Sequence, residues 1–348
     1  MIKKTKRLRN FPLKIISLAG ANLAYSTCKR MIGKESITIL MYHSVVPSVP
    51  NWNIRFSVVS TNSATFEQQM KYLKKNCTVL DSEGLYKIMR GEKAPKNPVF
   101  ISFDDGYRDN YLIAYPILKK YKLPAIIALT TGHIGKSELF WWDKIDYAIM
   151  NTSKTRLDIF NGYNIGTLEE KHKAIFDILQ ELKELEDNKK NKLIETFLQD
   201  LKITLPKLPN VFLNWDDVRE MSKNRIEFAS HSVTHPIMTK LKFDDAKQEI
   251  LDSTAEIEKY TGKKVRIFTY PNGSKGDISE KIDNFLEKQG FWFSMSTNYD
   301  VNYINKPLFC LNRVGVAEDD TFDIFKLKVS GLSVVLRRIC DKIFGAEK

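Results

Sequence analysis

The chain has 348 residues and a formal net charge of +12, with 43% hydrophobic and 28% charged residues. This length and composition predict one large domain or two ordinary ones, and they exclude a disordered chain and a membrane protein with many spans. The four cysteines lie far apart without a CxxC pair, which excludes a disulfide scaffold and a cysteine-built zinc site.

The excess positive charge lies at the two ends of the chain. Residues 1–34 carry nine Lys or Arg and no acidic residue, and residues 326–348 carry six basic and two acidic residues. Residues 35–325 contain 39 basic and 40 acidic side chains. A nucleic-acid enzyme would carry its positive charge beside its chemistry, so we expect no nucleic-acid partner. Basic tails with interleaved apolar residues are typical of proteins that bind an anionic membrane surface.

The N-terminal segment 1–35 is open to three interpretations. Its basic start and the apolar residues that follow favour an amphipathic surface helix, a signal or anchor segment is the second possibility, and a solvated arm is the third. Lys14 interrupts the apolar stretch, which is too short for a transmembrane helix of about 20 apolar residues. We therefore expect a membrane-associated or cell-envelope protein on an undecided side of the membrane, with a peripheral cytoplasmic protein as the alternative.

From residue 36 to about 325, apolar strands alternate with amphipathic helices. Strands are predicted at 37–43, 79–80, 99–103, 125–129, 226–229, 265–270 and 291–296. Helices are predicted at 65–75, 82–90, 109–121, 215–221, 243–260 and 278–289. Strands that are apolar on both faces and alternate with helices indicate a parallel sheet or barrel in an α/β domain.

Two further segments are predicted to be helical. The region of about 145–208 is rich in Lys, Glu and Leu with apolar residues at helical spacing, so we expect one or two solvated helices that form a lid or packing insertion. In 326–348, apolar and basic residues alternate at helical spacing, which predicts a basic C-terminal helix, either docked on the domain or facing a membrane.

Two adjacent carboxylates follow the strand predicted at 99–103. Asp104 and Asp105 precede Gly106. Because a buried unpaired charge is costly, carboxylates at the end of a buried strand should be exposed, paired or bound to a cation. A tight turn built from Asp-Asp-Gly is the alternative interpretation.

Two histidines four residues apart follow the strand predicted at 226–229. The chain contains only five histidines, and the spacing of His231 and His235 places both rings on one side of a helical turn. A pair of surface histidines is the alternative. Two imidazoles and one carboxylate, with positions left for water and substrate, make a catalytic site for zinc or another divalent metal.

Three motifs in this order and at these separations resemble those of a known family. They are Ser-Phe-Asp-Asp-Gly at 102–106, His-Ser-Val-Thr-His at 231–235 and Phe-Thr-Tyr-Pro-Asn-Gly at 268–273. Over about residues 37–315 the chain is similar to the polysaccharide deacetylases, the NodB homology domain or carbohydrate esterase family four. The resemblance implies a distorted (β/α) barrel, here of about seven strands with a helical insertion, and metal-dependent removal of acetyl groups from sugars.

The resemblance also implies roles for individual residues. Asp105, His231 and His235 match the family's metal ligands, for Zn²⁺ or alternatively Co²⁺ or Ni²⁺, and Asp104 matches its general base. A backbone N–H of the substrate-binding loop formed by Tyr270, Pro271, Asn272 and Gly273 would stabilise the oxyanion. Trp142 is a candidate for stacking on a sugar, with core packing as the alternative.

The chain departs from the family pattern at two places. Members often have an Arg where this chain has Thr269, and they often have a late histidine that acts as the general acid, whereas no histidine follows His235. Among the other three histidines, His43 ends the first strand at the barrel end where Asp104 lies, so we expect it rather than His133 or His172 to be the acid.

Arg313 is the expected replacement for the missing arginine as the partner of Asp104, with a surface ion pair as the alternative. These residues together predict a metal-dependent enzyme that removes N-acetyl groups from a surface polysaccharide containing N-acetylhexosamine, or from its precursor. An O-deacetylase and a catalytically silent glycan-binding barrel are the alternatives.

Overall fold

A computed structural model describes residues 35–47, 60–160, 162–206, 211–317 and 319–344. The basic segment 1–34 lies outside the described residues, so its three interpretations stay open. In the described part of the chain, no helix combines the length and the apolar character needed to cross a membrane.

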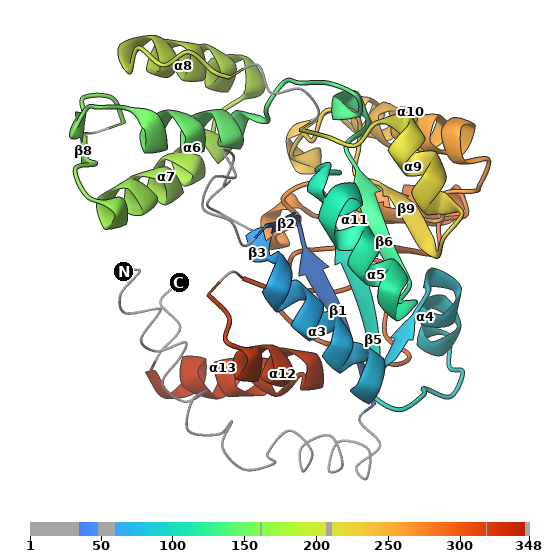
Figure 1. Ribbon diagram of the computed structural model, residues 1–348. Helices are drawn as coiled ribbons and strands as arrows, with labels where there is room; N and C mark the ends of the chain where they lie inside the picture. Colours follow the sequence, from blue (N-terminus) through green and yellow to red (C-terminus); the bar gives the residue numbers. More distant parts are fainter. Residues whose placement is uncertain (1–34, 48–59, 161, 207–210, 318, 345–348) are drawn as a thin grey trace.

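A nine-stranded sheet forms the centre of the protein (Figure 1). Its order is β11-β10-β9-β6-β5-β1-β12, with β4 beside β5 and β13 beside β1, and all its pairs are parallel except β1 with β12. The strands are β1 (Ser36–Tyr42), β4 (Thr78–Leu80), β5 (Pro98–Phe103), β6 (Ala125–Leu129), β9 (Ile226–Ser230), β10 (Ile267–Thr269), β11 (Phe293–Met295), β12 (Asn302–Tyr303) and β13 (Val314–Gly315). This arrangement confirms the predicted parallel α/β fold.

The segment 311–315 joins the two sides of the curled sheet. Leu311 forms a parallel bridge with Met295 at the end of β11, and three residues later β13 begins and pairs in parallel with Leu40 and Met41 of β1. The sequence did not predict β13, because two residues are too few to show a strand period. The barrel therefore has seven parallel strands, namely β1, β5, β6, β9, β10, β11 and β13.

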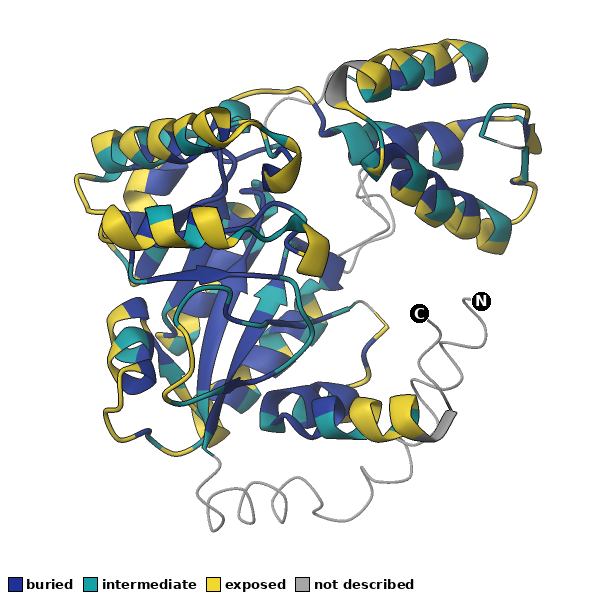
Figure 2. Cartoon of the chain, turned by 180° about the vertical axis from the view of Figure 1, so that it is seen from behind, coloured by how far each residue is buried: buried dark blue, intermediate teal, exposed yellow. Residues whose placement is uncertain are grey.

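Helices cover the outside of the sheet (Figure 2). They are α3 (Ser63–Asn76), α4 (Ser82–Met89), α5 (Tyr115–Tyr121), α9 (Trp215–Ser222), α10 (Phe243–Thr261) and α11 (Glu280–Lys288), with short 3-10 turns at η2 (Thr131–His133), η3 (Met238–Lys240) and η4 (Lys275–Asp277). The side chains of Asn62, Asp81 and Asn214 accept hydrogen bonds from the first turns of α3, α4 and α9. Such caps satisfy N–H groups that a helix cannot pair internally.

The helix predicted at 109–121 is divided into two parts. A π-helical turn, η1 (Asn110–Ala114), precedes α5. Pro116 is the second residue of α5 and has no N–H to donate, so the ordinary hydrogen bond from this position to the preceding turn is absent. The widened turn ends with the N–H of Tyr115 donating to the carbonyl of Asn110.

Three helices of the 145–208 region form a unit beside the barrel (Figure 1). They are α6 (Trp141–Asn151), α7 (Leu168–Lys183) and α8 (Asp187–Asp200), accompanied by the hairpin of β7 (Arg156–Leu157) and β8 (Tyr163–Asn164). Their inner faces share a separate hydrophobic core that includes Ile145, Ile178 and Phe197. This core buries the apolar stripes that the sequence displayed at helical spacing.

The C-terminal region contains two helices rather than the single helix expected over 326–348. These are α12 (Phe322–Ser330) and α13 (Leu332–Phe344). Gly331 lies between them with a φ of +81°, a left-handed conformation that glycine adopts at low cost and that ends α12.

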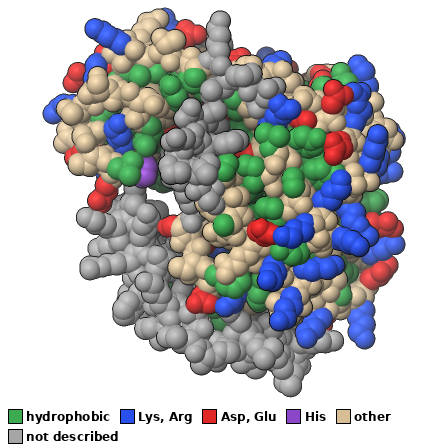
Figure 3. All heavy atoms as spheres, in the orientation of Figure 1, with side chains coloured by type: hydrophobic (Ala, Val, Ile, Leu, Met, Phe, Trp, Pro, Cys, Tyr) green, Lys and Arg blue, Asp and Glu red, His purple; other side chains and the backbone are tan. Residues whose placement is uncertain are grey.

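Basic and acidic side chains are intermixed on the face shown in Figure 3, with hydrophobic side chains between them.

A short parallel pair, β2 (Ser44–Val46) with β3 (Ser60–Asn62), extends from the end of β1. The core beneath α3 is aromatic: the ring of Phe66 packs edge-on against Tyr42 at 5.3 Å and against Phe103 at 5.9 Å. Aromatic pairs at these distances add to the stability that area burial provides.

We expect the Phe66→Ala substitution to lower the free energy of unfolding by about 3–5 kcal/mol, because it leaves a cavity between α3 and the sheet. Urea-induced unfolding measures this change. The matched control is Phe176→Ala on α7, where the side chain is 54% exposed and the change should stay within about 0.5 kcal/mol. Equal losses in the two variants would contradict the core position of Phe66.

Candidate functional site

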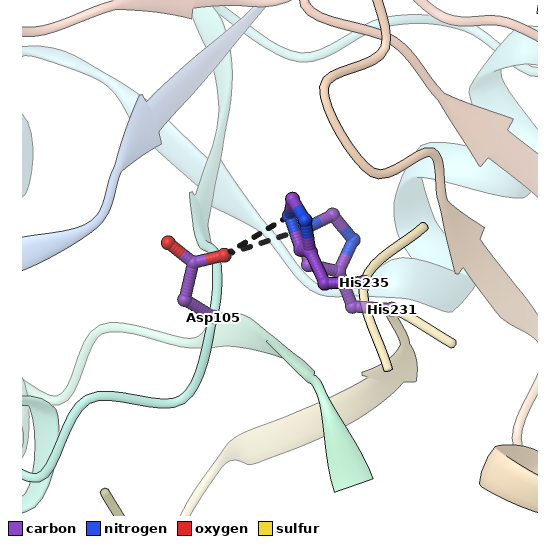
Figure 4. A group of neighbouring side chains, drawn as sticks. All are labelled: Asp105, His231 and His235. Carbon is purple, nitrogen blue, oxygen red and sulfur yellow. Dashed lines mark ion pairs between the residues drawn. The ribbon is translucent and has the colours of Figure 1, made fainter. Parts of the chain in front are cut away.

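Three side chains converge at the carboxyl ends of β5 and β9. Asp105 follows β5, and both His231 and His235 belong to the loop after β9 (Figure 4). The Nε2 atoms of the two histidines each lie 3.5 Å from Oδ1 of Asp105, and all three side chains are buried. Among the residues that the structure describes, this is the one group of three acidic, histidine or cysteine side chains arranged to hold a metal ion.

The spacing of these atoms fits a divalent cation. With ligand distances of about 2.1 Å and tetrahedral angles, two ligand atoms of one zinc ion lie about 3.4 Å apart, close to the 3.5 Å found here. Two imidazole nitrogens and one carboxylate oxygen are also ligands that zinc, cobalt and nickel accept. The donor set and its geometry therefore fit the expected site for a divalent metal.

Hydrogen bonding fixes the orientation of one imidazole. Nδ1 of His231 lies 2.8 Å from the carbonyl oxygen of Thr269, so it donates to that oxygen, and Nε2 of the same ring faces Asp105. The contact exists because β9 and β10 are parallel neighbours with Ser230 opposite Phe268. Nδ1 of His235 is buried and has no hydrogen-bond partner within the described ranges.

Asp105 and its neighbour Gly106 adopt an uncommon backbone conformation. Asp105 has a φ of +74° and Gly106 a φ of +77°. A Cβ at Gly106 would lie 3.0 Å from the Leu129 side chain and 3.2 Å from that of Ile134, so glycine permits the close approach. The left-handed conformation at Asp105 costs about 1–2 kcal/mol and turns its carboxylate toward the histidine loop.

Asp104 forms a buried bidentate ion pair with Arg313. Nη1 and Nη2 of the guanidinium each donate to one carboxylate oxygen at 2.7 Å. The side chain of Arg313 is 0% exposed and that of Asp104 is 2% exposed. Nε of Arg313 donates to the carbonyl of Ser296 at 2.7 Å. Arg313 lies in the segment that joins β11 to β1, so the pairing expected from the sequence occurs inside the barrel and not on its surface.

His43 lies on the other side of Asp104. Its Nε2 is 3.9 Å from Oδ2 of Asp104, and its side chain is 18% exposed. The two residues are neighbours because Tyr42 pairs with Phe103 in the parallel register of β1 and β5. Asn110 donates to the carbonyl of His43 at 2.7 Å and holds this strand end in place.

The other two candidate histidines lie elsewhere. His133 is part of η2, where its Nδ1 lies 3.1 Å from the carbonyl of Glu138 and its ring packs against Phe140. His172 is exposed on α7. The structure thus brings His43 and neither of the others within 4 Å of Asp104 among the ion pairs it describes.

The electrostatics of the site favour positive charge next to the carboxylates. Burial by itself would raise the pKa of Asp104, but the Arg313 guanidinium and the nearby imidazoles outweigh it and hold that pKa well below its usual range. Burial would lower the pKa of His231, yet the two aspartates raise it. Burial and the neighbouring His231 lower the pKa of His235 to about 3, so this imidazole is neutral and able to act as a ligand.

The loop after β10 differs in part from expectation. Tyr270 was expected to bind substrate, but its side chain is fully buried and its hydroxyl donates to Asp283 at 2.9 Å. This side chain therefore belongs to the core, because a buried phenol needs a hydrogen-bond partner there. Gly273 has a φ of +60°, and a Cβ there would lie 2.9 Å from the carbonyl oxygen of Tyr270, so the tight turn requires glycine.

Backbone donors in this loop are mostly used within the fold. The N–H of Tyr270 donates to the carbonyl of Met295, and that of Gly273 donates to the carbonyl of Pro271. Pro271 has no N–H of its own. Within the part of the chain that the structure describes, Asn272 is therefore the residue of this loop whose backbone N–H has no acceptor.

An aromatic wall borders His235, formed by residues that α6 and the neighbouring loops provide. The ring of Trp142 lies 4.6 Å from that of His235 and stacks on Phe140 at 4.3 Å. The indole N–H of Trp142 donates to Tyr107, whose hydroxyl donates to Asp143 at 2.9 Å. Trp142 is half-buried at the edge of the site, which is compatible with its expected contact with a sugar.

The contact between Tyr107 and Asp143 was not predicted, since nothing in the spacing of these residues indicates it. Asp143 is 1% exposed, and burial raises its pKa well above the usual range of a carboxyl group. The negative charge of Asp105 acts in the same direction as burial and disfavours the ionised form of Asp143. The hydrogen bond between Tyr107 and Asp143 links the loop of Asp105 to α6.

Comparison with known proteins finds similarity to deacetylases that act on polysaccharides. A family model described as "Polysaccharide deacetylase" matches residues 91–291. A poly-beta-1,6-N-acetyl-D-glucosamine N-deacetylase of Staphylococcus aureus (strain MSSA476) is 34% identical over 149 residues, which are 41% of this chain and 46% of that protein. The chain thus matches about half the length of these curated relatives. YxkH of Bacillus subtilis (strain 168) is 23% identical over 81% of this chain and 71% of that protein.

Solved structures share the fold. The deacetylase PplD of Streptococcus pyogenes, solved in complex with acetate, has a TM-score of 0.58 and 19% identity over 85% of this chain and 99% of its own. IcaB from Ammonifex degensii has a TM-score of 0.55 and 18% identity over 86% of this chain and 97% of its own. These neighbours agree with the seven-stranded (β/α) barrel described above. Because the family model matches more than half of the chain, the protein belongs to the polysaccharide deacetylase family.

Proposed function

We propose that this protein is a metal-dependent hydrolase that removes N-acetyl groups from a polysaccharide containing N-acetylhexosamine, or from its precursor. The observation that carries the proposal is the position of Asp104. This carboxylate is held ionised by Arg313 and lies next to three side chains that fit a divalent cation. A proton acceptor, a proton donor and a cation site thus meet at one end of the barrel.

Asp105, His231 and His235 would hold the cation, with Zn²⁺ preferred and Co²⁺ or Ni²⁺ as alternatives. When bound, such an ion polarises the acetyl carbonyl and lowers the pKa of water. The neutral state of His235 supports this role, because a protonated imidazole cannot be a ligand.

Asp104 acts as the general base and His43 as the general acid. Asp104 takes a proton from the attacking water at a carboxylate oxygen, and the bidentate contact with Arg313 fixes the direction of that oxygen. His43 is 3.9 Å from Asp104 and partly accessible, so its Nε2 can deliver a proton to the leaving amine. The backbone N–H of Asn272 is the donor for the oxyanion, since its neighbours in the loop have none free.

The names of the Staphylococcus aureus relatives support a glycan of β-1,6-linked N-acetylglucosamine as the first substrate to test. Trp142, at the edge of the site, is placed to contact a sugar. An O-acetylated polysaccharide is the alternative substrate, and it is distinguished by whether the product carries a free amine.

The basic ends of the chain support a location at an anionic membrane surface. On α13, Arg337 and Arg338 are exposed next to Ile339, which is 46% exposed. The N-terminal segment 1–34 adds nine basic residues and no acidic residue. Basic and apolar side chains together are the combination that binds anionic headgroups and their acyl boundary.

Removing divalent cations tests the metal dependence. With a β-1,6-linked N-acetylglucosamine oligosaccharide as substrate, a chelator should abolish the formation of free amine, and adding Zn²⁺ or Co²⁺ should restore it. Amine and acetate are measured in the same reaction, because acetate without amine indicates ester cleavage. Activity that is indifferent to the chelator would overturn the proposal.

The two proton-transfer residues are tested by single substitutions. Asp104→Asn and His43→Ala should each lower kcat by about 10²–10⁴-fold, which is the usual contribution of a positioned acid or base. Metal affinity should persist in both variants, because neither side chain is among the three ligands. His172→Ala, on the exposed side of α7, is the control and should retain full activity. A His43→Ala variant with normal kcat would show that the acid is another group.

The ion pair of Asp104 with Arg313 is tested by a double-mutant cycle. Arg313→Ala leaves a buried carboxylate without its partner, so the free energy of unfolding should fall by about 3–5 kcal/mol. In the Asp104→Asn background the same change should cost clearly less, because no negative charge remains to be compensated. Chemical denaturation of the four proteins measures both differences, and additive losses would refute the coupling.

A further inference from the structure

Resting on the metal site proposed above, we infer that Glu249 is a positioning residue for the two histidines. It lies on α10, outside the site, and contacts neither imidazole ring in the hydrogen bonds that the structure describes. Its carboxylate instead binds the backbone of the loop between them, residues 232–234.

Glu249 accepts three hydrogen bonds from this loop. One carboxylate oxygen accepts the N–H of Val233 at 2.8 Å and that of Thr234 at 2.9 Å, and the other accepts the Thr234 hydroxyl at 2.9 Å. Hydrogen bonds to an ionised carboxylate are about twice as strong as those between neutral groups. A single side chain thus fixes two consecutive peptide groups midway between the two ligands.

The opposite side of the loop rests on η2. The carbonyl of Val233 accepts from the N–H of Gly132 at 2.9 Å, and that of Ser232 accepts from the N–H of Thr131 at 3.2 Å. A Cβ at Gly132 would lie only 2.5 Å from the Val233 carbonyl oxygen, so glycine is required for this approach. The loop is therefore held between η2 and Glu249.

This loop needs external support because its backbone is strained. Ser232 has a φ of +65° and His235 a φ of +59°, and each left-handed residue without glycine's freedom costs about 1–2 kcal/mol. Within the loop, the N–H of His235 donates to the Ser232 hydroxyl oxygen at 3.0 Å. Without Glu249, the N–H groups of Val233 and Thr234 would turn to water and the loop could relax toward unstrained angles.

The relaxation would separate the two Nε2 atoms, since His231 is also fixed from behind by Thr269 while His235 depends on the loop. Metal affinity responds strongly to such changes: loss of an outer supporting contact typically weakens binding about 10–100-fold. We therefore expect Glu249 to contribute to cation affinity and ligand geometry, beyond any contribution to folding stability.

The experiment measures Zn²⁺ affinity of the metal-free full chain by competition with a chromophoric chelator, and the visible absorption spectrum of the Co²⁺ form. Glu249→Ala should weaken Zn²⁺ binding by about 10-fold or more and alter the Co²⁺ bands, which report ligand geometry. Glu249→Gln should bind nearly as the unmodified protein does, because its amide oxygen can accept the two N–H groups and its NH₂ can donate to Thr234.

Two further variants separate positioning from general effects. Asp245→Ala removes an exposed carboxylate one turn earlier on α10 and should leave both readouts unchanged. Gly132→Ala disturbs the loop from the other side and should weaken Zn²⁺ binding in the same way as Glu249→Ala, which keeps the test available if one variant does not fold.

The Tm of the metal-free proteins completes the comparison. Normal Zn²⁺ affinity and a normal Co²⁺ spectrum in Glu249→Ala, even with a lowered Tm, would overturn the inference and leave a purely structural contact. If the unmodified protein itself binds no divalent cation, the proposed metal site fails, and with it the inference. The two failures are therefore distinguishable.

Discussion

Two consecutive carboxylates are almost fully buried at the end of β5, and each of them faces a different set of partners. Asp104 receives the Arg313 guanidinium from the segment that joins β11 to β1. Asp105 faces His231 and His235 and fits a divalent cation shared with them. The two charges point apart because Asp105 adopts a left-handed backbone conformation. The ion pair of Asp104 with Arg313 thus connects the candidate site to the segment that completes the barrel.

Some of the strained backbone of the described residues lies at the carboxyl ends of the strands. Asp105, Ser232, His235 and Asn272 all have positive φ values without being glycine. Each lies in a loop whose polar groups are held by hydrogen bonds from neighbouring loops or helices, as Glu249 and η2 hold the histidine loop. Strained residues persist only where their surroundings determine the conformation. Here the sheet and the helices around it fix the conformation of these loops.

The helical unit of α6, α7 and α8 has its own core and yet reaches the site through its first turn. Trp142 packs against His235, and Asp143 accepts from Tyr107, two residues after Asp105. Movements of this unit relative to the barrel would therefore displace the contacts of His235. The aromatic wall also covers one side of His235, and electrostatic interactions are stronger where water is absent.

The sequence alone determined the parallel α/β class and six of the seven barrel strands. It also indicated the ionisable side chains of the candidate site, namely Asp104, Asp105, His231, His235, His43 and Arg313. These were accessible because buried strands, covering helices and closely spaced ligand pairs are local patterns, and because three motifs resemble one family. The tertiary structure alone decided that β13 completes the barrel, that Tyr270 belongs to the core, that Gly331 separates two C-terminal helices, and that Glu249 and Asp143 support the site. Such contacts join residues that are far apart along the chain. They depend on strand register and on the placement of helices, and a local sequence pattern contains no information on either.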